Sequence, residues 1–138
     1  MVTITLKGRE IPLIYTTYEM KQIQEEIAPI SDALVLVMGR NPEDENDLSR
    51  YGGVDHLGAA AKLIRILGNA GLEESGQDGN LTDKWVMRAL KPKDLMPTIN
   101  ACMDALAEGM ATEIQEKENE GPVDVTLEEM KKKDGPAN

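Results

Sequence analysis

The sequence predicts an α+β fold in which an N-terminal two-stranded β-hairpin packs on a bundle of four to five helices. Apolar and polar residues alternate along residues 2–15, on both sides of a glycine. In several later segments, apolar residues recur every three or four positions, and polar segments that contain Gly or Pro separate them. The length of 138 residues suits a single domain. We place this domain at residues 1–118, followed by a flexible acidic tail at residues 119–138.

The composition excludes several classes of protein. The chain carries 15 basic and 25 acidic side chains and a formal net charge of −10, whereas a nucleic-acid binder needs a basic face. A single cysteine, Cys102, excludes an intramolecular disulfide framework and a Cys-rich zinc module, and it is typical of a cytosolic protein. No apolar run approaches the roughly 20 residues that span a bilayer, and no leader-like segment precedes Val2. We therefore expect a cytoplasmic protein that binds neither nucleic acid nor membranes.

The alternation at residues 2–15 predicts the hairpin. Gly8 can adopt a positive φ at no steric cost, which suits the first central position of a two-residue type II′ turn. The resulting register pairs Lys7 with Glu10, Leu6 with Ile11, Ile4 with Leu13 and Val2 with Tyr15. One face of the hairpin is then apolar. Pro12 would face Thr5 at a hydrogen-bonded position, for which proline has no N–H, so the register stays open and a bulge is an alternative.

Two short helices are expected after the hairpin. Thr16 or Thr17 can cap the first helix. Its apolar residues at helical spacing are Met20, Ile23 and Ile27. Pro29 ends or kinks this helix, because an interior proline removes a hydrogen bond and clashes with the preceding turn. Ser31 can begin the second helix, although the apolar run at residues 34–38 is also compatible with a buried strand.

The central helix is expected after a loop at residues 40–53. Asp55 can cap this helix, and Gly68 and Gly71 are expected to end it. Its apolar stripe consists of Leu57, Ala60, Ala61, Ile64 and Leu67, widened by Leu63 and Ile66. So broad a stripe is typical of a well-buried helix.

Two further helices complete the predicted domain. Thr82 can cap a short helix that carries Trp85, and Pro92 suits the first turn of the last helix. The apolar stripe of the last helix consists of Leu95, Ile99, Cys102 or Met103, Leu106, Met110 and Ile114. We expect the helices at 55–70 and 92–114 to form the main core, with Trp85 at its edge.

Two residues suggest chemistry, and both have a simpler interpretation. His56 follows Asp55, and a His–carboxylate pair is a common start for acid–base catalysis, but no nucleophile or second metal ligand stands at helical spacing from it. We interpret His56 as a surface residue beside a helix cap. Cys102 lies on the expected core face, where cysteine behaves as a small hydrophobe. The sequence therefore predicts no catalytic, cofactor-binding or metal-binding residue.

Three groups of residues could bind a partner. The acidic run at residues 43–47 suggests calcium but lacks the Gly and the final Glu of an EF-hand loop, so a solvated loop is favoured. The acidic stretch that begins at Glu108 could meet a basic partner or simply be solvated. It comprises Glu108, Glu113, Glu116, Glu118, Glu120, Asp124, Glu128 and Glu129. Four methionines, Met87, Met96, Met103 and Met110, could line an apolar groove between helices or fill the core, which is favoured. Acidic residues could rim such a groove.

The order of these segments resembles the tail assembly chaperones of long-tailed bacteriophages and prophages. The resemblance covers roughly residues 2–115. It consists of the strand–Gly–strand at 2–15, the Thr-capped helix with the run at 20–27, the Ala- and Leu-rich helix at 59–67, the Leu-Thr-Asp at 81–83 and the long last helix. It includes no catalytic motif. Pro12, Pro29 and the acidic loop after Gly39 depart from the pattern.

The resemblance implies a role in binding, in the cytoplasm of a bacterial host. Such chaperones bind the tape-measure protein and help tail-tube subunits polymerise around it, so these two proteins are the implied partners. A homo-oligomer is also expected, because coating a repetitive client favours repeated contacts between copies. A ribosomal frameshift at Lys131-Lys132-Lys133, which would give a longer second product, is a further hypothesis beside that of an ordinary charged tail. The alternatives are a minor tail or tail-completion protein retained in the virion, and a small enzyme that uses Asp55, His56 and the carboxylates.

Overall fold

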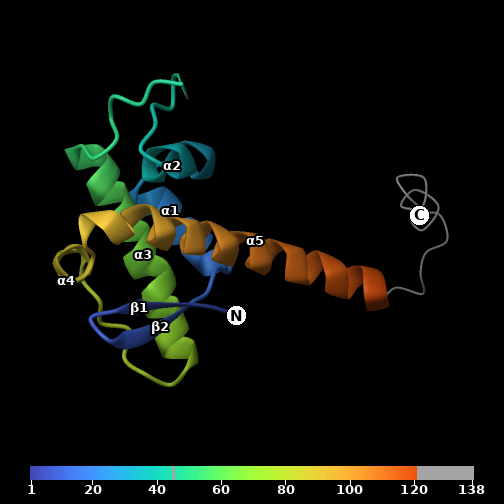
Figure 1. Ribbon diagram of the computed structural model, residues 1–138. Helices are drawn as coiled ribbons and strands as arrows, with labels where there is room; N and C mark the ends of the chain where they lie inside the picture. The colour runs from blue at the N-terminus through green and yellow to red at the C-terminus, as the bar shows by residue number, and fades with distance from the viewer. Residues whose placement is uncertain (45, 121–138) are drawn as a thin grey trace. The chain divides into compact units, whose positions relative to one another are not determined.

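The computed structural model describes residues 1–44 and 46–120 and confirms the α+β class. In chain order, these residues form β1 (Val2–Leu6), β2 (Arg9–Leu13), α1 (Thr17–Glu26), α2 (Ile30–Val37), α3 (Val54–Glu74), α4 (Asp83–Ala89), the short 3-10 helix η1 (Pro92–Asp94) and α5 (Leu95–Glu120) (Figure 1). The chain divides into two units, Met1–Ala107 and Glu108–Asn138. The domain boundary at residue 118 stays a prediction, because residues 121–138 lie outside the described part.

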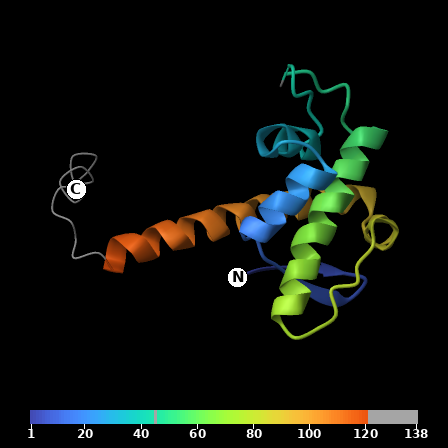
Figure 2. The same ribbon diagram turned by 180° about the vertical axis from the view of Figure 1, so that it is seen from behind.

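Helix α3 is the centre of the first unit. Strand β2 packs against it, and so do α1, α2 and α4; Figures 1 and 2 show the hairpin at one end of α3 and α2 at the other. Helix α3 contributes the largest set of buried apolar residues, Ala59, Ala60, Ala61, Leu63, Ile64, Ile66, Leu67 and Leu72. From α5 come Leu95, Ile99, Cys102, Ala105 and Leu106. The two predicted helices therefore do form the main core, and Trp85 packs partly buried against it. Two residues of their predicted apolar stripes are nevertheless exposed, Leu57 at 38% and Met110 at 60%. The side chain of Ile114 lies outside the described residues.

The hairpin forms with a different register from the predicted one. Its turn consists of Lys7 and Gly8, both with positive φ (53° and 76°), which is a type I′ turn rather than type II′. The strands pair Val2 with Leu13, Thr3 with Pro12, Ile4 with Ile11, Thr5 with Glu10 and Leu6 with Arg9. Hydrogen-bonded and non-hydrogen-bonded pairs alternate from the turn, so Pro12 occupies a non-hydrogen-bonded position and needs no N–H.

The short helices form where the sequence predicts them, but one residue that was predicted on an apolar face is exposed. Thr16 caps α1 in a capping box with Glu19, whose carboxylate accepts hydrogen bonds from the Thr16 N–H and hydroxyl. Ile23 is buried, but Met20, predicted on the same face, is 37% exposed. Residues 30–37 form a helix and not a strand, with Pro29 at its N-cap. Pro92 lies in η1, just before α5.

Helix α3 begins and ends differently from the prediction. Gly53 occupies the N-cap position without a side-chain cap. Asp55 lies in the first turn, where its carboxylate interacts favourably with the helix dipole. The helix continues to Glu74 through Gly68 and Gly71, which were expected to end it. Both glycines are buried where the hairpin approaches α3 closely, so their place in the sequence reflects packing and not a helix end. In the described residues, none of the helices combines the length and the apolar character needed to cross a bilayer.

Candidate functional site: an apolar pocket lined by helices

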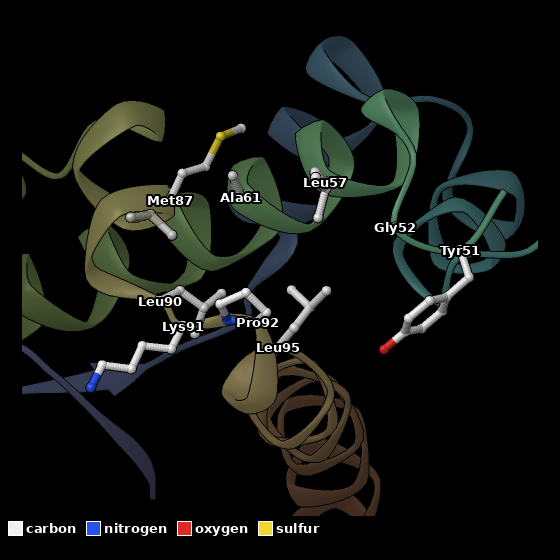
Figure 3. Close-up of a pocket in the computed structure, with 10 residues that line it drawn as sticks. Tyr51, Gly52, Leu57, Ala61, Met87, Leu90, Lys91, Pro92 and Leu95 are labelled. Carbon is white, nitrogen blue, oxygen red and sulfur yellow. The ribbon is translucent and has the colours of Figure 1, made fainter.

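A pocket of about 440 Å³ lies between α3, α4, η1, the start of α5 and the loop before α3. It is lined by Tyr51, Gly52, Leu57, Ala61, Val86, Met87, Leu90, Lys91, Pro92 and Leu95. In Figure 3, Leu57, Ala61 and Met87 line one side, Leu90, Pro92 and Leu95 line the other, and Tyr51 stands at one end. We call this cavity the apolar pocket.

Local sequence features place each wall of the apolar pocket. Leu57 and Ala61 are four residues apart on α3 and therefore share one face of that helix. Helix α4 begins where Thr82 accepts a hydrogen bond from the Trp85 N–H at 3.1 Å. The segment before α4 is held to α3 by Asn69, whose amide oxygen accepts from the Leu81 N–H at 2.8 Å and whose amide nitrogen donates to the Leu81 carbonyl at 3.3 Å.

The base of the apolar pocket is buried and its rim is exposed. Val86, Ala61 and Leu95 at the base are 0%, 2% and 8% exposed. At the rim, Tyr51, Leu57 and Met87 are 50%, 38% and 46% exposed. Large apolar side chains half-exposed around a hollow are typical of a surface that binds another apolar group. The apolar pocket can therefore receive apolar side chains of a partner.

The sequence left open an acidic rim around such a groove, but the charge at the apolar pocket is positive. Among the described residues that line it, Lys91 is the only charged one. Figure 3 shows its amine pointing away from the apolar side chains. Of the four candidate methionines, Met87 lines the pocket, Met96 and Met103 pack partly buried against the core, and Met110 is 60% exposed.

His56 supports the loop end of the apolar pocket from inside the protein. It is 1% exposed, so the prediction of a surface residue is wrong. Its Nδ1 accepts a hydrogen bond from the Gly52 N–H at 2.9 Å, and its ring lies 4.9 Å from the ring of Tyr51. Gly39, at φ 81°, packs so closely that a Cβ there would lie 3.0 Å from His56 Nδ1. His56 thus fixes Tyr51 and Gly52, the two loop residues that line the pocket.

The imidazole of His56 is buried as the neutral form. Because Nδ1 accepts a hydrogen bond, the proton of the neutral ring is on Nε2, which has no hydrogen-bond partner among the described residues. Burial lowers the pKa of His56 from its ordinary value of 6.5, because an imidazolium is poorly solvated there. The backbone of Val37 opposes this shift more weakly, although no hydrogen bond of normal geometry joins it to Nε2 in the described residues.

We expect His56 to give the folded state a pH dependence. The pKa of His56 is lower in the folded state than in the unfolded state, so the unfolded state binds more protons as the pH falls below about 6.5. The free energy of unfolding should therefore be highest above pH 6.5 and fall towards pH 5. In His56→Asn, whose amide oxygen can accept the Gly52 N–H, this slope should flatten. Urea unfolding of both proteins at pH 7.5 and 5 measures the difference, and equal slopes would contradict the expectation.

The remaining candidates do not join the apolar pocket. Cys102 is fully buried, and burial raises the pKa of its thiol to about 12, so its thiolate is strongly disfavoured. In the acidic loop, Asn41, Asp44 and Asp47 each accept a backbone N–H two residues ahead, as in Asx turns. In the described part of the chain, no three His, Cys, Asp or Glu side chains are placed to hold a metal ion.

Two predictions concern residues outside the described part. Of the acidic side chains in this stretch, the structure describes that of Glu108 alone, and the frameshift hypothesis concerns Lys131, Lys132 and Lys133, which lie beyond residue 120. Both stay predictions.

Sequence reasoning missed the apolar pocket because its residues come from three separate segments. Leu57 and Ala61 were expected in the core, Tyr51 lay in a stretch interpreted as a loop, and Pro92 was considered only for the first turn of the last helix. The one available signal was Met87, which was considered for a groove. No family model, characterised protein or solved structure matches this chain.

Proposed function

We propose that this protein is a non-enzymatic tail assembly chaperone of a long-tailed phage or prophage. It binds the tape-measure protein in the host cytoplasm and assists the polymerisation of tail-tube subunits. The observation that carries the proposal is the apolar pocket, whose rim exposes Tyr51, Leu57 and Met87. The order of segments in the sequence, which resembles that of such chaperones, supports it independently.

The apolar pocket fits a client whose helices expose apolar residues. An amphipathic helix presents such residues every three or four positions, and a hollow lined by helices can receive one or two of them. Met87 is unbranched and polarisable, so it can repack against different client side chains. The net charge of −10 would keep a coated client dispersed. Several copies would lie side by side along a long client, so self-association is part of the proposal.

Substitutions at the pocket rim test the proposal. We expect the wild-type chain, co-expressed with the tape-measure protein of the same phage or prophage, to keep that client soluble and to co-purify with it. Leu57→Asp and Met87→Asp should each weaken the complex by about tenfold or more, because a carboxylate would be buried against apolar groups. Their half-exposed positions should leave folding intact, which circular dichroism checks.

Val54→Asp is the matched control. Val54 is 87% exposed and does not line the apolar pocket, so this change adds the same charge to α3 without touching the site. Client binding that is unchanged in all three variants, or equally lost in all three, would contradict the proposal. Mass spectrometry of purified phage particles separates a chaperone, which should be absent, from a minor tail or completion protein, which should be present.

A further inference from the structure

A second hollow, of about 680 Å³, lies between the hairpin and the helices. One wall is Thr3–Leu6 of β1 together with Lys7 of the turn, and the other comprises residues of α4, η1 and the first turns of α5, from Arg88 to Ala101. We call this hollow the β1 groove. It lies entirely within the unit Met1–Ala107.

The edge of β1 that faces away from β2 has unpaired backbone groups. Thr3 and Thr5 occupy non-hydrogen-bonded pairs of the hairpin, so their N–H and C=O groups point away from β2. In the described residues, no backbone hydrogen bond reaches them from outside the hairpin. The outer edge of β2, in contrast, is covered by α3, since the Pro12 carbonyl lies against Gly71 and the Ile14 N–H donates to the Leu67 carbonyl at 3.2 Å. The edge of β1 can therefore accept a further strand.

The charge of the β1 groove selects an acidic strand. Four exposed cations line it, Lys7, Arg88, Lys91 and Lys93, against one carboxylate, Asp94. This is a local excess of positive charge in a chain whose net charge is −10. An acidic segment in the groove would gain favourable electrostatic interactions that a neutral or basic one would not.

The chain itself contains a segment with this chemistry. Residues 123–128 read Val-Asp-Val-Thr-Leu-Glu, so apolar and polar side chains alternate, two of the apolar ones are β-branched, and two of the polar ones are acidic. Alternation is what a strand needs when one of its faces packs against protein and the other meets solvent or charge. Four residues of β1, Thr3–Leu6, line the groove and offer about 14 Å of edge, with which four residues of such a segment can pair.

We propose that the β1 groove binds residues 123–128 of a second copy of this chain, which pair with the edge of β1. The contact is head to tail, so each copy offers one groove and one segment and can continue a row of copies. The inference rests on the self-association included in the proposed function, and it names the contact. It does not use the apolar pocket except where Lys91 lines both hollows.

Sedimentation velocity of the full chain over a concentration series tests this contact. We expect the wild type to associate with increasing concentration, and less so in high salt, because the groove contact is partly electrostatic. Thr5→Pro removes the outward N–H without breaking a hairpin hydrogen bond, as Pro12 does in β2, and should weaken association by about tenfold or more. Thr5→Val keeps the N–H and should associate like the wild type.

Two charge-reversal variants test the groove and the segment without changing the backbone of β1. They therefore test the proposed contact even if Thr5→Pro fails to fold. One carries Asp124→Lys and Glu128→Lys, and the other carries Arg88→Glu and Lys93→Glu. Each alone should be a monomer. An equimolar mixture should regain association, because the intact segment of one variant meets the intact groove of the other and the reversed segment and reversed groove also carry opposite charges.

Several results would overturn the inference. They are a wild type that stays monomeric at all concentrations, a mixture that stays monomeric, or association lost in Thr5→Pro but kept in the Asp124→Lys, Glu128→Lys variant. The last result would mean that the edge of β1 pairs with β1 of a second copy, and not with residues 123–128. Neither Arg88 nor Lys93 lines the apolar pocket, so client binding should survive their reversal. Loss of self-association and loss of client binding can therefore be told apart.

Discussion

Gly71→Ala is expected to lower the free energy of unfolding by about 3 kcal/mol or more. A Cβ at position 71 would lie 1.8 Å from the Pro12 carbonyl oxygen and 2.4 Å from its carbon. Both atoms belong to the backbone of β2, so no side-chain rotation can relieve the overlap. The hairpin would have to move away from α3, and apolar contacts in the core would be lost with it.

Gly58→Ala is the matched control within the same helix. A Cβ at Gly58 would meet nothing within 4 Å, so only the backbone preference changes. Alanine favours a helix over glycine by up to about 1 kcal/mol, so Gly58→Ala should stabilise the protein slightly. Denaturation in guanidinium chloride, followed by circular dichroism, measures both variants. Two shifts of the same sign would contradict the close approach of α3 and β2.

This close approach explains why the end of α3 was predicted wrongly from the sequence. Glycine inside a helix costs about 1 kcal/mol relative to alanine, so Gly68 and Gly71 suggest a helix end when the helix is considered alone. Close packing requires glycine here in spite of this cost. A Cβ at Gly68 would lie 2.8 Å from Leu81, which precedes α4, and 3.1 Å from Ile11 of the hairpin. Nothing in the local sequence identifies that partner, since it comes from a distant segment.

The hairpin illustrates which part of a fold the sequence determines locally. Alternation has a period of two, so moving the register by two residues keeps Ile4, Leu6, Ile11 and Leu13 on one face. The face was therefore predictable, whereas the register depended on which residues form the turn. Lys7 accepts a positive φ of 53°, which is uncommon for lysine, and that choice removes the conflict at Pro12.

The candidate site was less predictable than the core. The core follows from periodicity along single helices, which the sequence displays directly. The apolar pocket instead depends on how α3, α4 and the start of α5 meet, and on Tyr51, which His56 fixes from the interior. A lone His beside an Asp is more often exposed, and only tertiary packing shows that His56 is buried and supports the loop.

Arg65→Met should destabilise the protein by about 2 kcal/mol, between the values typical of exposed and of buried ion pairs. The Arg65 guanidinium joins three helices. From α3 it donates to Asp83 of α4 at 2.6 Å and forms an ion pair with Glu26 of α1. Its side chain is 18% exposed, and those of Asp83 and Glu26 are 34% and 35% exposed, so solvent screens the pairs only in part. Methionine keeps most of the apolar stem and removes the charge, which leaves Lys62, at 3.1 Å, as the cation that binds Asp83.

Lys21→Met makes the same chemical change in an exposed pair. Lys21 and Glu25 are 2.7 Å apart, but their side chains are 64% and 57% exposed, so solvent screens the pair and the loss should be much smaller than that of Arg65→Met. Urea unfolding at neutral pH compares the two variants, and equal losses would show that partial burial adds nothing to the Arg65 pairs.

The dependence on pH gives a second, independent measure of the Arg65 contact. Burial by itself would raise the pKa of Asp83, but hydrogen bonds from Arg65 and Lys62 outweigh it, so this pKa lies below its ordinary value of 3.8. A carboxylate whose pKa is lowered by folding contributes stability above its unfolded pKa, and that stability is lost as the pH falls through the folded pKa. The wild type should therefore lose this contribution below about pH 4. In Arg65→Met, much of the favourable interaction is gone while burial remains, so unfolding curves of the two proteins should converge as the pH falls from 5 to 3. A gap that stays constant over this range would mean that Arg65 stabilises the helices by packing and not by its charge.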